Sequence, residues 1–138
     1  MTLHFSNLNL WAILVCIVSN MVIGGLWYSP ILFGNIWLKS INKKASDISR
    51  EDANKTMMIS LIPAILTVFF LAVTISFVNA VTVVDALVIG TLVSLGFIGM
   101  NLINLVLFEN RSMKLTLISI GYSFVSLNIA AVILTLWK

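Results

Sequence analysis

The residues in this sequence that could do chemistry stand mostly at the edges of apolar stretches. Glu109 and Arg111 place a carboxyl group and a guanidinium two positions apart, which could serve as an acid and its charged partner. Asn101 and Asn104 precede them at i, i+3 spacing, which puts both amides on one face of a helix. Amides gathered in this way could line a polar pocket, whereas a charged pair at the end of an apolar helix is far more often an anchor at a membrane surface.

The sequence lacks the residue patterns of the common enzyme classes. It contains one histidine, His4, and one cysteine, Cys16, so a histidine metal site, a histidine-based triad or a disulfide cannot form within one subunit. It has no glycine-rich phosphate loop ending in lysine and no nucleophile elbow. We therefore predict no enzymatic activity, no catalytic residues, no metal site and no cofactor, and we expect Cys16 to be an apolar filler.

Long apolar stretches dominate the chain. Of its 138 residues, 60% are hydrophobic and 9% are charged. Stretches without charge cover residues 5–38, 57–84, 86–108 and 115–137, and each could cross roughly 30 Å of hydrocarbon as a helix. Because these stretches are apolar on every face, helices are favoured over a barrel of alternating strands. The sequence predicts an all-α integral membrane four-helix bundle forming a single domain over 1–138, with spans at about 8–28, 57–78, 86–108 and 115–137.

Basic residues predict how the chain is oriented. Seven of the eight Lys and Arg residues fall in the first and third connections, where the first is the loop 39–56. The positive-inside rule makes these connections cytoplasmic and puts both termini outside. We expect a multi-pass protein of the cell inner membrane, with the lipid bilayer as a partner and no nucleic acid, because the basic residues mark orientation. The seven are Lys39, Lys43, Lys44, Arg50, Lys55, Arg111 and Lys114.

Local signals mark the ends of several elements. Ser29 before Pro30 should end the first helix at the headgroup level, and residues 31–38 are too few to span, which predicts a short interfacial helix. Ser49 with Asp52 predicts a helix that starts near residue 50 and runs into the second span. Asp85 is expected to cap the third span.

Two patterns inside the spans predict irregular or close packing. Pro63 removes a backbone donor within the second span and predicts a kink there. Small residues in the third span predict a surface for close helix packing. They are Gly90, Ser94, Gly96 and Gly99.

Polar and aromatic residues gather at the predicted cytoplasmic side of the spans. They could form a pocket facing the cytoplasm, or they could hydrogen-bond between helices, where a buried Asn contributes about 0.6 to 2 kcal/mol. We favour the second interpretation, and the first stays open. The candidate cluster is Trp27, Tyr28, Pro30, Phe33, Gly34, Trp37, Glu109, Arg111 and Tyr122. The candidate polar lining is Asn20, Asn101, Asn104 and Ser119.

Three motifs resemble a known membrane family. GGLWYSPILFGNIW at 24–37, LFENR at 107–111 and the Gly-Tyr pair at 121–122 are similar in order and spacing to the family catalogued as domain of unknown function 1761. This chain has Ser112 where the family typically has Pro, and Ser123 where the family often has His. The resemblance implies a small helical membrane protein and no particular activity.

Topology predicts that the motifs meet. Two spans lie between the first and second motifs, so both should lie at the same side of the membrane, with Trp27 and Tyr28 packed near Glu109. The leading functional prediction is a structural or regulatory, self-associating membrane protein whose cytoplasmic cluster binds an unknown protein partner or a lipid headgroup. The alternative is a small channel or carrier for a neutral or weakly charged solute, with asparagines along its path. No Asp, Glu, Lys, Arg or His lies deep in a span, which argues against proton-coupled transport by a membrane-centred carboxylate.

Overall fold

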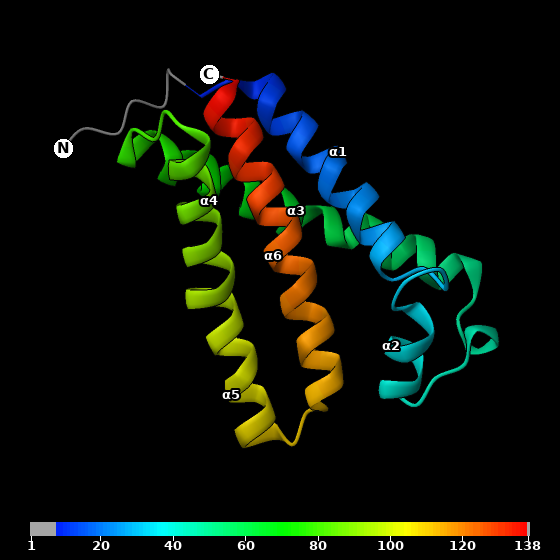
Figure 1. Ribbon diagram of the computed structural model, residues 1–138. Coiled ribbons are helices and arrows are strands. Elements are labelled where there is room, and N and C mark those ends of the chain that lie inside the picture. The colour runs from blue at the N-terminus through cyan, green and yellow to red at the C-terminus, as the bar shows by residue number, and fades with distance from the viewer. Residues whose placement is uncertain (1–7, 138) are drawn as a thin grey trace.

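The computed structural model describes residues 8–137, and over that range the chain folds into helices joined by turns and short connections (Figure 1). The elements are α1 (Leu10–Trp27), α2 (Gly34–Ser40), the 3-10 turn η2 (Ala45–Asp47), α3 (Arg50–Val78), α4 (Val83–Thr91), the π-helical segment η3 (Leu92–Gly99), α5 (Met100–Glu109) and α6 (Met113–Leu136). Together α4, η3 and α5 form one long helix. The predicted all-α fold with four long apolar helices is confirmed. His4 lies outside the described residues.

Helix ends form where the capping signals stand. The Ser49 hydroxyl accepts a hydrogen bond from the backbone N–H of Asp52 at 3.0 Å, and α3 begins at Arg50, directly after Ser49. Thr82 and Asp85 form a capping box at the start of α4, because each side chain accepts from the backbone N–H of the other residue. Asn79, with φ of 57°, ends α3 in the left-handed conformation. The predicted caps at Ser49 and Asp85 are confirmed.

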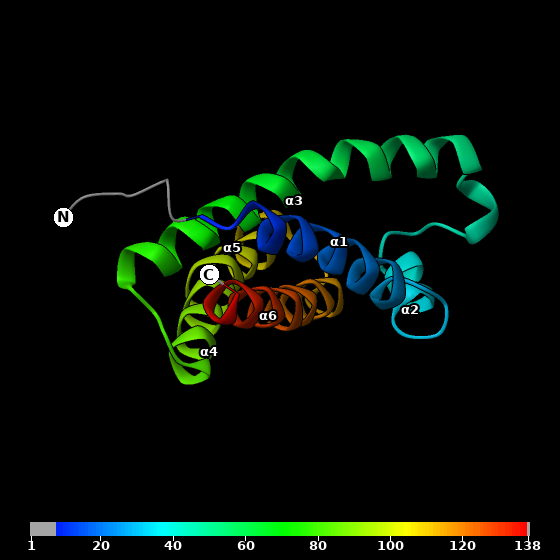
Figure 2. The same cartoon turned by 90° about the horizontal axis from the view of Figure 1, so that it is seen from above.

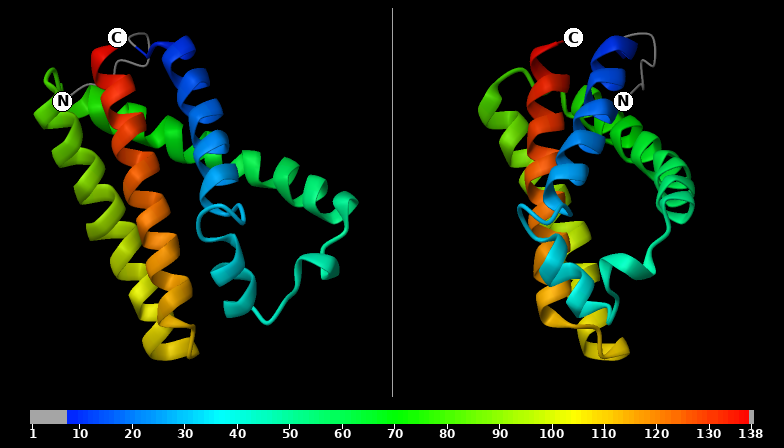
Figure 3. Two further views of the ribbon diagram at one scale, coloured as in Figure 1. Left: turned by 45° about the vertical axis from the view of Figure 1, so that its right-hand side comes forward. Right: turned by 90° about the vertical axis from the view of Figure 1, so that its right-hand side faces the viewer.

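The long helices place the loops and the chain ends at opposite ends of the molecule. The helix formed by α4, η3 and α5 lies beside α6, and α1 packs on the other side of α6 (Figures 1 and 3). The end that carries α2 and the α5–α6 turn is named the α2 end. The start of α1, the end of α6 and the α3–α4 turn lie at the opposite end (Figure 1).

Helix α3 crosses the other helices and extends past them on one side (Figure 2). Its second half packs into the core, where Val68, Leu71 and Ile75 are at most 3% exposed. Residues 50–60, in contrast, are all exposed. Pro63 is also exposed, and α3 remains helical on both sides of it. Because the first half of α3 extends past the other helices, the bundle is more open than four parallel helices would be.

The core lies where α1, α4, α6 and the second half of α3 meet. Small side chains allow the close approach: Ala12, Ala86 and Ala131 are at most 1% exposed. Cys16 is fully buried, and its thiol contacts the carbonyl oxygen of Ala130 at 3.6 Å. Packing of this kind relies on contact between backbones, which small residues permit.

The long helix that contains η3 changes its winding in the middle. A π turn holds more residues than an α turn, so the residues after η3 face a different direction from those an unbroken α-helix would present. Gly90 is buried against Asn128, where a Cβ atom would lie 2.8 Å from Oδ1. Phe97 follows seven residues later, nearly two α-helical turns, yet it is 69% exposed. The π segment has therefore turned the helix about its axis.

This change in winding divides the small residues that were expected to form one packing surface. Gly90, Ser94 and Gly99 are buried. Gly96 is exposed, and no atom lies within 4 Å of the position that its Cβ would take. The prediction is correct for the three buried residues and wrong, within this chain, for Gly96.

Candidate functional site

An elbow joins α1 to α2 at the α2 end. The backbone N–H of Phe33 donates to the carbonyl oxygen of Trp27 at 3.0 Å, and that of Gly34 donates to Ser29 at 2.8 Å. Gly34 is buried, and a Cβ there would lie 2.6 Å from the carbonyl carbon of Ser29. Pro30 is exposed at the tip. The short helix expected at 31–38 therefore begins three residues later, since residues 28–33 make the turn.

Trp27 attaches the elbow to α6. Its indole Nε1–H donates to the carbonyl oxygen of Ile118 at 3.0 Å. The ring lies 4.8 Å from that of Phe33, centroid to centroid. Gly121 lies beneath the indole, where a Cβ would be 2.9 Å from Cζ2. The first motif and the Gly-Tyr pair are thus in direct contact.

Tyr28 and Tyr122 continue this contact on the neighbouring surface of α6. Their ring centroids are 5.6 Å apart, and Trp37 meets Tyr28 edge-on at 5.7 Å. The Tyr122 hydroxyl donates to the backbone carbonyl of Asn20 at 3.3 Å, which connects α6 to α1. Gly24 faces the same hydroxyl, because a Cβ there would be 3.4 Å from it. These aromatic rings hold α1, α2 and α6 together.

The structure places Arg111 beside Tyr28. Arg111 and the Ser119 side chain both lie near the Tyr28 hydroxyl. The Arg111 Nε is buried and has no hydrogen-bond partner among residues 8–137. Glu109 is exposed at the end of α5. The chain turns between these two residues, with Asn110 at φ of 53°.

The four predicted lining residues do not share a surface. Asn20 is 5% exposed, and its side-chain oxygen has no partner in the described part of the chain. Ser119 is half-buried and donates to the Leu115 carbonyl at 3.0 Å. Asn101 and Asn104 are exposed on the outward face of α5. Within one copy of the chain, the two asparagines of α5 therefore line no interior path.

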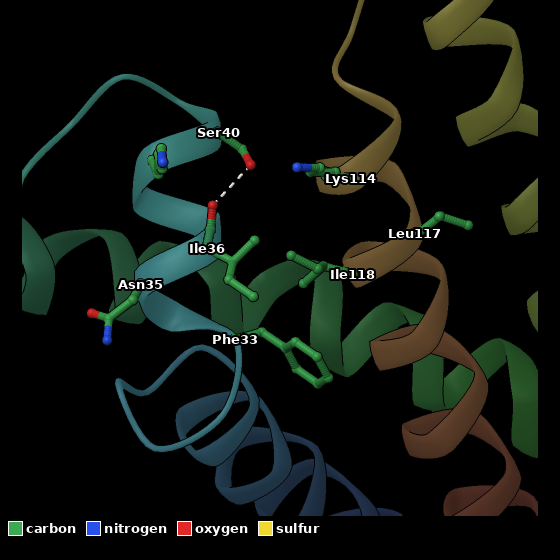
Figure 4. A pocket seen from close by; sticks show the side chains of 8 residues that line it. Phe33, Asn35, Ile36, Ser40, Lys114, Leu117 and Ile118 are labelled. Atoms are coloured by element: carbon green, nitrogen blue, oxygen red, sulfur yellow. Dashed lines mark hydrogen bonds between the residues drawn. The ribbon is translucent and has the colours of Figure 1, made fainter.

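A pocket of about 670 Å³ lies between α2 and the start of α6 (Figure 4). Two lysines, Lys39 and Lys114, are the charged residues of its lining, and no acidic residue contributes to it among those described. In Figure 4, Lys114 and Ser40 face each other at one end, and Phe33 lies toward the other. The complete lining, named the α2–α6 pocket, is Phe33, Asn35, Ile36, Lys39, Ser40, Lys114, Leu117 and Ile118.

Most residues of the α2–α6 pocket were not among the predicted site residues, because the lysines had served only to indicate orientation. A signal was nevertheless present in the sequence. Phe33, Ile36 and Ser40 stand at i, i+3 and i+7, which puts them on one helical face. Lys114 and Ile118, at i and i+4, likewise lie on one helical face. What the sequence did not contain was the pairing of these two faces, which depends on the elbow.

The fold and the comparisons together define the class of protein. Four helices in the described range are long and apolar enough to cross a membrane, which indicates a multi-pass membrane protein. The chain belongs to the family described as "Protein of unknown function (DUF1761)", whose profile matches residues 11–135. No curated protein and no solved structure matches it. Among the residues described, no group of three or more His, Cys, Asp or Glu side chains could hold a metal ion.

Proposed function

We propose that this protein is a non-enzymatic, structural or regulatory protein of the cell inner membrane, and that the α2–α6 pocket binds the anionic headgroup of a phospholipid in the cytoplasmic leaflet. The observation that carries the proposal is the composition of the pocket. Lys39 and Lys114 supply positive charge, and apolar side chains such as Ile36 and Leu117 supply the rest of the lining. A phospholipid has the matching structure, with a phosphate attached to an apolar body.

Electrostatics favours an anion in this pocket. Lysine ammonium groups act as compact positive charges toward phosphate, and each contributes about 1 kcal/mol to binding at an anionic membrane surface. No carboxylate in the described lining competes for Lys39 or Lys114. Basic pockets between helices at the cytoplasmic side are a common way to hold such headgroups. Two lysines therefore supply a contribution of about 2 kcal/mol.

The elbow favours a lipid over free phosphate. Ile31 is 84% exposed and Leu32 is 49% exposed at its tip, and such side chains are stable when inserted at the boundary between headgroups and acyl chains. The pocket would then open at the level of the headgroups. The cluster of Trp27, Tyr28 and Tyr122 has a positioning role in this proposal, because it holds α2 against α6.

Native mass spectrometry in mild detergent tests the proposal by counting bound lipids. We expect phosphatidylglycerol to remain bound more often than phosphatidylcholine with the same acyl chains. The double variant Lys39→Gln/Lys114→Gln should weaken phosphatidylglycerol binding about 30-fold, which corresponds to about 2 kcal/mol. Inorganic phosphate should not displace the lipid.

A matched variant separates the pocket from general surface charge. Lys43→Gln/Lys44→Gln removes the same two charges from the neighbouring connection, outside the pocket lining. We expect it to retain most of the phosphatidylglycerol binding. Equal weakening in the two double variants, or displacement by inorganic phosphate, would contradict a lipid site in the pocket.

A further inference from the structure

The outward face of η3 and α5 carries two asparagines among apolar side chains. Six residues of this face are exposed, and they repeat with the spacing of a heptad: Phe97 and Asn104, Met100 and Leu107, and Asn101 and Phe108 are each seven apart. The four apolar members are between 53% and 84% exposed. We name this surface the α5 seam. Its spacing is that of helices which pack side by side along a shared line.

The asparagines of the α5 seam lie at a depth where water is scarce. The helix Val83–Glu109 has 27 residues and is therefore about 40 Å long, about 10 Å more than the hydrocarbon that it would cross. Asn101 and Asn104 lie about 12 Å and 8 Å from its end, so both fall at or inside the hydrocarbon boundary. Acyl chains offer an amide no hydrogen bond, which makes exposure to them unfavourable.

Hydrogen bonds within the chain leave some donors and acceptors of these two amides without a partner. The Asn101 Nδ2 donates to the carbonyl oxygen of Phe97 at 2.7 Å, which leaves its oxygen as an acceptor. The Asn104 side-chain amide makes no hydrogen bond with any residue in the range 8–137. An acceptor and a full amide therefore face outward from the helix.

The π segment is the reason that they face outward. Gly90, which contacts α6, lies seven residues before Phe97 and fourteen before Asn104. In an unbroken α-helix all three would lie on nearly the same face, and Asn104 would point toward α6. The change in winding at η3 instead directs Asn104 away from the chain's own core.

We propose that the α5 seam is the contact surface for a second copy of this chain, and that the Asn104 amides of the two copies hydrogen-bond to each other. An amide carries both donors and acceptors, so asparagine is complementary to itself. Two copies inserted in the same orientation are related by an axis along the membrane normal, which places each seam residue opposite its own equivalent. An asparagine at a repeating core position of such a seam, as Asn104 is, specifies the oligomeric state and the register.

The surroundings of the seam permit this contact. Gly96 directly precedes it, is exposed and has open space where a Cβ would stand, so the partner helix could approach closely. The opposite face of α5 is already occupied by α6. The seam also lies away from the α2–α6 pocket, because no residue of η3 or α5 lines that pocket among those described.

Cysteine cross-linking in native membranes tests the interface. In a Cys16→Ala background, which removes the only native cysteine, Met100→Cys should give a disulfide-linked dimer after mild oxidation. Phe70→Cys on α3 and Val88→Cys on α4 are matched controls, since both positions are exposed and apolar but lie outside the seam. We expect at least fivefold less dimer from either control. Equal cross-linking at all three positions, or a product with the mass of a different protein, would overturn the proposal.

A second change isolates the role of Asn104. Adding Asn104→Leu to Met100→Cys should lower the dimer yield severalfold, whereas Asn104→Gln, which keeps an amide, should retain much of it. Because Asn104 is exposed, neither change should alter the thermal unfolding of the monomer or its binding of phosphatidylglycerol. A dimer yield that does not respond to Asn104→Leu would refute the amide contact. Failure of the proposed lipid site would leave these results unchanged.

Discussion

At the scale of single residues, glycines set how closely the elbow approaches its neighbours. At Gly34 the neighbour is backbone, since a Cβ would overlap the carbonyl groups of Tyr28 and Ser29. At Gly121 the neighbour is the Trp27 indole, which is held by its hydrogen bond to α6. These two contacts explain why small residues stand in the two motifs. The motif residues therefore have a positioning role, because their contacts fix α2 against α6.

The first residue-scale prediction concerns Gly34. Gly34→Ala should destabilise the protein by about 1 to 3 kcal/mol, because the added methyl group meets backbone that cannot move away as a flexible side chain would. Thermal unfolding in detergent, followed by circular dichroism, measures the change. Gly25→Ala is the control, since no atom lies within 4 Å of the Cβ position there. If the two variants unfold at the same temperature, the close contact at Gly34 has no energetic role.

Residue identities alone predicted part of the candidate site. Trp27, Tyr28 and Tyr122 were grouped from motif order and expected depth; the structure packs Tyr28 near Tyr122 and hydrogen-bonds Trp27 to Ile118, one turn before Tyr122. Lys39 and Lys114 were not grouped, because 75 positions separate them and neither carries a local signal of ligand binding. Their shared pocket exists only because the elbow turns α2 toward α6.

At the scale of elements, helix ends were predictable and helix faces were not. Capping depends on residues three positions apart, as at Ser49 and Asp52, so the sequence contains the whole signal. The face of α5 depends on η3, whose wider π turns contact α6. Their expected depth and their i, i+3 spacing predicted a lining role for Asn101 and Asn104, whereas both are exposed on α5.

The contact between α1 and α6 gives the element-scale prediction. Trp27→Phe keeps an aromatic ring but removes the Nε1–H that donates to Ile118. We expect a loss of about 1 kcal/mol in stability, the usual net contribution of one hydrogen bond. Trp11→Phe in the same helix is the control, because Trp11 is 70% exposed. Chemical unfolding of both variants in detergent would show whether only Trp27→Phe lowers the midpoint.

At the scale of the whole molecule, the number of long helices was predictable but their arrangement was not. Hydrophobicity identifies a membrane-spanning stretch because the bilayer requires about 20 apolar residues. The same stretch is apolar on every side, so its composition does not indicate which side contacts protein and which contacts lipid. Helix α3 illustrates this: Leu66 and Phe70 are at least 50% exposed, while the neighbouring Val68 is fully buried.

Membrane orientation is the whole-molecule prediction on which the lipid proposal depends. The α2 end holds the first and third connections, which carry seven of the eight basic residues, so we expect this end to face the cytoplasm. A fluorescent protein that matures only in the cytoplasm should stay dark when fused to the C-terminus, and a periplasmically active reporter should be active there. Fusions within the connection 41–49 should give the reverse pattern. A bright C-terminal fusion would put the α2–α6 pocket outside, where the attraction of its lysines to cytoplasmic anionic lipids would no longer apply.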